Sequence, residues 1–273
     1  MNGSADALIL HPLNGVFFGF FAIFVLLLIL AGVLLRRKSE RTRKAAVVIA
    51  GAAGLVCFFL YKYALFTDPE YDGLTAAMGG FNWWGEFPLQ LCNINMLLIP
   101  IAVLTDSRPL KSFGFFVGPI GALMAILMPV AGFDGYSILL PRMLGYYGIH
   151  CLIIIMALSL AVLGLYEPRF RDLPGTIVTL LLVALAIHGV NLLLRYTGLH
   201  PHANYFFSVE TEGNPLLEVF RGWIPIPYLY LLPACGILAV WAALLTLIYN
   251  LCSRKGKTKR PGKARRKKKG ARA

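Results

Sequence analysis

Long apolar stretches alternate with short polar connections along most of this chain. Each stretch has roughly the 20 residues that a helix needs to cross about 30 Å of hydrocarbon. The pattern predicts seven membrane-spanning helices, at 16–35, 45–66, 88–105, 113–131, 143–165, 176–194 and 228–251. The expected fold is therefore all-α, a polytopic bundle in which residues 1–252 form one transmembrane domain.

The composition agrees with a membrane protein and departs from the usage of soluble globular domains. Of the 273 residues, 58% are hydrophobic and 14% are charged. The first apolar stretch has no Lys or Arg before it and several after it, which favours a retained span over a cleavable signal peptide. The five cysteines show neither CxxC nor metal-ligand spacing, so we expect no disulfide framework, metal ion or other cofactor.

The basic residues predict the orientation, because positively charged connections are retained in the cytoplasm. Placing 36–44, 106–112, 167–175 and the carboxyl-terminal segment inside puts 22 of the 26 Lys and Arg residues there. The amino terminus is then outside and the carboxyl terminus is cytoplasmic. We expect a multi-pass protein of the cell membrane.

Residues 253–273 form a separate polybasic segment. Twelve of the 26 Lys and Arg residues lie between 254 and 272. With no apolar face to bury, this segment is expected to be a disordered cytoplasmic tail. Its expected partners are anionic lipid head groups. Nucleic acid is not an expected partner, since no aromatic stacking platform accompanies the charge.

A polar cluster interrupts the third apolar stretch close to its start. The segment EFPLQLCNINMLLIP carries Glu86, Gln90, Cys92, Asn93 and Asn95. Polar groups in hydrocarbon are costly unless they are paired or face a wet cavity. Taken singly, the asparagines would be hydrogen-bonding groups between helices and the cysteine a small packed hydrophobe. The cluster as a unit favours a functional site.

Three chemically active side chains on separate predicted helices fall at one depth. At about 1.5 Å per residue, Cys92, His150 and His188 lie about 6, 10 and 9 Å from the outer ends of their helices. The other polar residues expected near this level are Tyr146, Asn191, Asn204 and Tyr205. Because the cytoplasmic half of the spans is almost wholly apolar, the asymmetry predicts an outward-facing polar pocket.

A thiol and an imidazole within hydrogen-bond reach form a nucleophile and its base. His150 would take the proton of Cys92, and the thiolate would attack an acyl carbon to give a thioester. Nearby asparagines could donate to the oxyanion or fix the imidazole tautomer. A metal site of His150, His188 and Glu86 is a weaker interpretation, because three ligands would have to converge without a tight motif.

Five short motifs follow one another along the chain: PLQLCNI at 88–94, a His at 150, NLL at 191–193, ANYFF at 203–207 and GWIPIPY at 222–228. Together they resemble the YwaF family of bacterial integral membrane proteins, which is similar to eukaryotic transmembrane protein 164, a phospholipid acyltransferase that uses a Cys and a His. The resemblance implies a bacterial plasma membrane location, with Cys92 as the nucleophile and His150 as the base. It also implies that Asn191, Asn204 and Tyr205 occupy matching positions, whereas Gln90 stands where bacterial members often have His.

Several functions remain open at this point. The leading hypothesis is an acyltransferase that acts on membrane phospholipid through an acyl group on Cys92. A lipid hydrolase would use the same Cys/His pair with water as the acceptor. A transporter or small-ligand binding protein would use the pocket without covalent chemistry, but no predicted span carries an Asp or Glu suited to proton coupling, and no inverted repeat is evident. A purely structural membrane protein is the remaining alternative.

Overall fold

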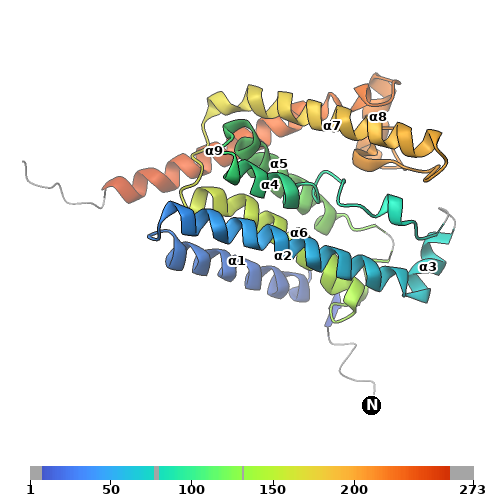
Figure 1. Ribbon diagram of the computed structural model, residues 1–273, viewed down its shortest axis with the longest axis horizontal. Coiled ribbons are helices and arrows are strands. Elements are labelled where there is room, and N and C mark those ends of the chain that lie inside the picture. The colour runs from blue at the N-terminus through green and yellow to red at the C-terminus, as the bar shows by residue number, and fades with distance from the viewer. Residues whose placement is uncertain (1–7, 77–79, 131, 259–273) are drawn as a thin grey trace, which may run out of the picture.

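The computed structural model describes residues 8–76, 80–130 and 132–258 and is a bundle of long helices (Figure 1). Within these residues, six helices are long and apolar enough to cross a membrane. They are α1 (Gly15–Leu35), α2 (Glu40–Phe66), α5 (Arg108–Leu127), α6 (Pro141–Val162), α7 (Leu173–Tyr196) and α9 (Ala234–Thr258). The prediction of a polytopic helical membrane protein is confirmed at this level.

The third predicted span, 88–105, is helical only in its second half. Helix α4 (Asn95–Leu104) has 10 residues, which at 1.5 Å per residue covers about 15 Å, or half of the hydrocarbon thickness. Residues 88–94 form successive turns instead. The side-chain oxygen of Gln90 accepts a hydrogen bond from a distant backbone N–H, and the amide of Asn95 donates to the carbonyl of Leu91. Such side-chain to backbone bonds offer this segment an alternative to a regular helix.

Helices α5 and α6 form the centre of the bundle. Helix α6 packs against α1, α2 and α5, while α5 also contacts α4, α7 and α9. In Figure 1, α4 and α5 accordingly lie between a layer of α1, α2 and α6 and a second layer of α7 and α9. Gly51 lets helices α2 and α4 pack closely, because a Cβ at this position would lie only 2.4 Å from Pro100 Cγ of α4.

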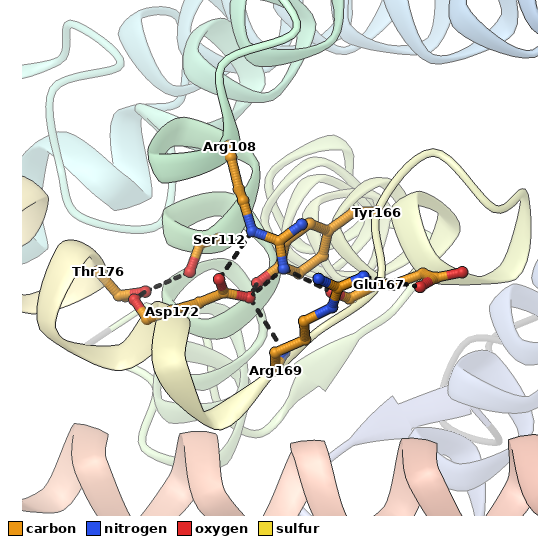
Figure 2. Close-up of polar contacts among 7 residues, drawn as sticks. All are labelled: Arg108, Ser112, Tyr166, Glu167, Arg169, Asp172 and Thr176. Atoms are coloured by element: carbon orange, nitrogen blue, oxygen red, sulfur yellow. Dashed lines mark hydrogen bonds and ion pairs between the residues drawn. The ribbon is translucent and has the colours of Figure 1, made fainter.

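One end of the bundle, which we call the basic end, carries the connections 36–39, 105–107 and 163–172. A polar network joins the helices there (Figure 2). Arg108, the first residue of α5, donates two hydrogen bonds of 2.8 Å to the carboxylate of Asp172, next to the start of α7. The hydroxyl of Tyr166 donates to the same carboxylate at 2.8 Å. The network therefore fixes the start of α5 against the connection between α6 and α7.

The opposite end, which we call the site end, carries the connections 67–94, 128–140 and 197–233. The connections include the short helices α3 (Pro69–Thr75) and α8 (Pro215–Trp223). They also include strand β2 (Tyr136–Ser137), which pairs antiparallel with strand β1 (Ile9–Leu10) from the segment before α1. In the sheet, Ile9 lies opposite Ser137. The site end is thus the more elaborate of the two (Figure 1).

Helix α9 extends into the first residues of the predicted tail. Helix α9 continues to Thr258, so the first six residues of the predicted tail, 253–258, are helical. The rest of the predicted tail, 259–273, lies outside the described residues, as do residues 1–7.

Candidate active site

Cys92 and His150 come together at the site end, where the turns before α4 meet the middle of α6. The Sγ atom of Cys92 is 3.4 Å from Nε2 of His150, inside the range of about 3 to 4 Å expected for a nucleophile and its base. His150 is 6% exposed and Cys92 is half-buried. The structure therefore places these two predicted residues in direct contact, although they are 58 positions apart in the sequence.

The contacts of the imidazole define its tautomer. Nδ1 of His150 lies 2.7 Å from the backbone oxygen of Tyr146. A carbonyl oxygen can only accept a hydrogen bond, so Nδ1 carries the proton and the neutral ring presents the lone pair of Nε2 to the thiol. The Tyr146 ring lies 4.6 Å from the imidazole, and its hydroxyl donates to the backbone oxygen of Ala125 at 2.8 Å. Tyr146 thus holds the imidazole through its carbonyl and through its ring.

Cys92 lies where helical hydrogen bonding begins. The N–H of Ile94 donates to the oxygen of Gln90 at 2.9 Å, four residues back as in an α-helix. The partial positive charge at the start of a helix favours an anion, including a thiolate. The turns that shorten α4 therefore put the thiol at a helix start, deep within the bundle.

The two asparagines beside Cys92 are buried and incompletely paired. Asn93 is 8% exposed and Asn95 is 0% exposed, and among the described residues neither Oδ1 atom has a hydrogen-bond partner. The Nδ2 group of Asn95 donates to the oxygen of Leu91 at 2.8 Å. A buried polar atom without a partner costs free energy and calls for an explanation, such as a bound ligand or a reacting group.

An ion pair that the sequence analysis did not single out as a pair lies at the same end. Lys62, close to the end of α2, contacts the carboxylate of Glu86, and the two side chains are 12% and 20% exposed. The ammonium of Lys62 faces the ring of Tyr61, which belongs to the same hydrophobic cluster as Tyr146, with Cys92 packed against that cluster. A sequence signal for it existed, because Lys62 is the only Lys or Arg in the predicted span 45–66, and an ionisable residue inside a span is a functional candidate.

The two predicted site residues of α7, His188 and Asn191, contact a loop and not the thiol. Nδ1 of His188 lies 3.0 Å from Oγ of Ser208. The amide of Asn191 donates to Oγ of Ser208 at 2.9 Å and to the oxygen of Tyr205 at 2.8 Å, and it accepts from the N–H of Tyr205 at 2.9 Å. His188 and Asn191 therefore fix the loop 200–212.

That loop in turn braces the segment that leads to Cys92. The N–H of Phe206 donates to the Gln90 side chain at 3.0 Å, and the N–H of Phe87 donates to the Tyr205 hydroxyl at 3.2 Å. Asn204 shapes the loop itself, since its amide donates to a backbone oxygen at 2.8 Å and to a carboxylate at 2.7 Å. Gln90, Asn204 and Tyr205 are thus positioned to support the site from outside.

Glu86, His150 and His188 contact different partners. Among the described residues, no group of three or more His, Cys, Asp or Glu side chains is arranged to hold a metal ion. Glu86 pairs with Lys62, and His188 contacts Ser208. The structure therefore does not bring these three residues together.

Comparison with known proteins gives one match. The family model described as TMEM164 family matches residues 11–249, a range that contains Cys92, His150 and the helices α1 to α8. No curated protein and no solved structure matches the chain.

Proposed function

The chain belongs to the TMEM164 family, and from that premise we propose that it is an integral membrane acyltransferase acting on phospholipids through an acyl group on Cys92. The observation that carries the proposal is the contact of 3.4 Å between the Cys92 sulfur and the His150 nitrogen that bears the lone pair. A thiol beside the basic nitrogen of a neutral imidazole is the arrangement that nucleophilic catalysis requires.

The first half-reaction loads the enzyme. Nε2 of His150 takes the proton from Cys92, and the thiolate attacks the carbonyl carbon of a phospholipid acyl ester. A C–S bond forms and the ester C–O bond breaks. The imidazolium gives its proton to the departing lysolipid oxygen, which leaves a thioester on Cys92 and a neutral His150.

The second half-reaction transfers the acyl group. His150 takes the proton of a lysolipid hydroxyl, whose oxygen attacks the thioester carbon. The new ester C–O bond forms, the C–S bond breaks, and the proton returns from His150 to the sulfur. Water in place of the hydroxyl gives a fatty acid, which is the hydrolase alternative.

Both half-reactions place negative charge on the carbonyl oxygen, and the start of α4 offers donors for it. The first backbone N–H groups of a helix lack a partner within the helix. Those of Cys92 and Asn93, in the turns that lead into α4, are therefore the candidate donors. Loss of one oxyanion donor typically costs about 10² to 10³ in rate.

The proposal places the protein in the cell membrane with the site end outside. The support for this orientation is the concentration of Lys and Arg residues in the connections of the basic end. The turns at 88–94 and helix α4 together then make a seventh crossing. The basic carboxyl-terminal residues would face anionic lipid head groups on the cytoplasmic surface.

The test uses purified protein in lipid vesicles with an acyl-labelled phospholipid and an unlabelled lysolipid. Cys92→Ala should abolish transfer, and His150→Ala should lower it by about 10² or more. Mass spectrometry should find the labelled acyl group on Cys92 of the wild type. Cys57→Ala, which removes an exposed thiol, is the matched control and should retain transfer. Full activity of Cys92→Ala would overturn the proposal.

Omitting the lysolipid separates the alternatives. An acyltransferase accumulates the acyl-enzyme, whereas a hydrolase continues to release fatty acid. A transporter would retain its cellular role in both the Cys92→Ser and the His150→Ala variant.

A further inference from the structure

Lys62 places a positive charge against the hydrophobic cluster on which Cys92 packs. Its ammonium faces the rings of Phe58 and Tyr61, which belong to that cluster together with Tyr146. The Lys62 side chain is 12% exposed. An ammonium group removed from water is costly unless it is paired. Its place in α2 therefore calls for an anionic partner.

The partner seen in the structure is Glu86, and it leaves part of the ammonium unused. An ammonium group has three N–H donors, and among the described residues a Glu86 carboxylate oxygen is the acceptor that contacts it. On other sides, the ammonium faces the rings of Tyr61 and Phe58, with centroids at 4.7 and 5.3 Å. Lys62 can therefore accept a further anion without leaving its aromatic surroundings.

Glu86 and Lys62 lie in different kinds of structure. Glu86 lies in the connection between the 3₁₀ turn Trp83–Gly85 and the turns at 88–94, whereas Lys62 lies in the long helix α2. A rotamer change of the Glu86 side chain is enough to separate the carboxylate from the ammonium, while the backbone of the connection and of α2 stays in place. The two partners of this ion pair are not equivalent.

We propose that Lys62 binds the phosphate of the phospholipid whose acyl chain is transferred, and that Glu86 is the counter-charge that this phosphate displaces. The proposal rests on the proposed function, because it is the acyl ester at Cys92 that brings the phosphate near. Only the glycerol carbons separate the ester from the phosphate in such a lipid. A charge-assisted hydrogen bond between ammonium and phosphate then orients the ester carbonyl toward the sulfur.

Variants of the two residues distinguish this role from a structural ion pair. A structural pair would suffer similarly from the loss of either partner. Under the proposal, Lys62→Met loses the phosphate contact, Lys62→Arg keeps it, and Glu86→Gln removes a competitor. The measured quantity is the ratio between the rates of Cys92 acylation by phosphatidylglycerol and by diacylglycerol with the same acyl chains, with no acceptor present.

We expect Lys62→Met to lower this ratio by about 10-fold to 100-fold, the range set by hydrogen bonds to charged groups. Lys62→Arg should restore most of it, and Glu86→Gln should leave it equal or raise it. An unchanged ratio in Lys62→Met, or an equal fall in Lys62→Met and Glu86→Gln, would overturn the proposal.

A binding measurement distinguishes failure of the phosphate site from failure of the proposed catalytic function. In the Cys92→Ala background, nitroxide-labelled phosphatidylglycerol should bind in preference to labelled diacylglycerol. Adding Lys62→Met should remove that preference. Adding Glu86→Gln should leave it in place. If no acyl-enzyme forms in the wild type but this preference depends on Lys62, the catalytic proposal fails and the phosphate site stands. Loss of the dependence on Lys62 refutes the phosphate site itself.

Discussion

Replacing Gly145 with alanine should force α2 and α6 apart beside the candidate active site. A Cβ at Gly145 would lie 2.5 Å from Cδ2 and 2.6 Å from both Cβ and Cγ of Tyr61. The Cβ of Tyr61 cannot yield without its backbone, so the clash is not relieved by a rotamer change. Overpacking of this kind costs about 1–3 kcal/mol, against which alanine regains up to about 1 kcal/mol of helix propensity.

Gly148 provides the matched control on the same helix. A Cβ there would meet nothing within 4 Å, so Gly148→Ala gains the propensity without a clash. We therefore expect Gly145→Ala to unfold with a free energy about 1–3 kcal/mol below that of Gly148→Ala. The measurement is reversible unfolding in mixed micelles, followed by intrinsic fluorescence.

Gly145→Ala should also lower the activity of the candidate active site. Gly145 precedes Tyr146, whose carbonyl fixes the His150 ring, and opening the clash to an ordinary contact of 3.4 Å moves the helices by about 1 Å. A misplacement of about 1 Å can cost on the order of 100-fold in rate, so acyl transfer by Gly145→Ala should fall by up to that factor. Equal unfolding free energies for the two alanine variants would refute the reasoning about the helix contact.

Three further predictions concern the polar contacts of the two ends. Asn191→Leu removes three hydrogen bonds to the loop it holds, at a net cost of about 2–4 kcal/mol, and hydrogen exchange in that loop should accelerate; unchanged exchange would contradict the assignment. Arg108→Ala removes the residue that donates two hydrogen bonds to the carboxylate of Asp172, whose side chain is 6% exposed. Because Arg108 itself is 40% exposed, solvent screening limits the loss in unfolding free energy to about 1–3 kcal/mol. Hydrogen bonds from Lys111 and Lys44 lower the pKa of Asp106 from 3.8 to about 2. The stabilising contribution of Asp106 is therefore present above pH 3.8 and is lost as the pH falls toward 2. Asp106→Asn should flatten the dependence of unfolding free energy on pH in that window.

The sequence predicts the long helices well because hydrophobic length is the dominant constraint in a membrane. The prediction for 88–105 failed in its first half for a tertiary reason. The Gln90 side chain is occupied by the backbone of Phe206, 116 residues away, and no local pattern contains that contact. The two short strands and helix α8 also depend on contacts between distant connections.

The sequence predicts how deep in the membrane the candidate site lies, but not all of its contacts. Counting 1.5 Å per residue put Cys92, His150 and His188 at one level, and the first two do meet. His188 contacts Ser208 instead, because depth and helix face do not specify which neighbour a side chain meets. Lys62 is the only basic residue of its predicted span, but its pairing with Glu86 is not predictable, because Glu86 lies in a connection whose path the sequence does not define.

The shortness of α4 has a consequence for how the protein is inserted into the bilayer. Ten residues fall below the roughly 17 to 25 apolar residues that a helix needs to partition as a span by itself, and α4 instead packs against α2, α5 and α6. The segment 88–107 should therefore fail to integrate when a nascent chain ends at 107, and should integrate once α5 and α6 follow. Assembly of the bundle would then precede the contact between Cys92 and His150, so the Cys92 sulfur reaches its position only after α5 and α6 have been inserted.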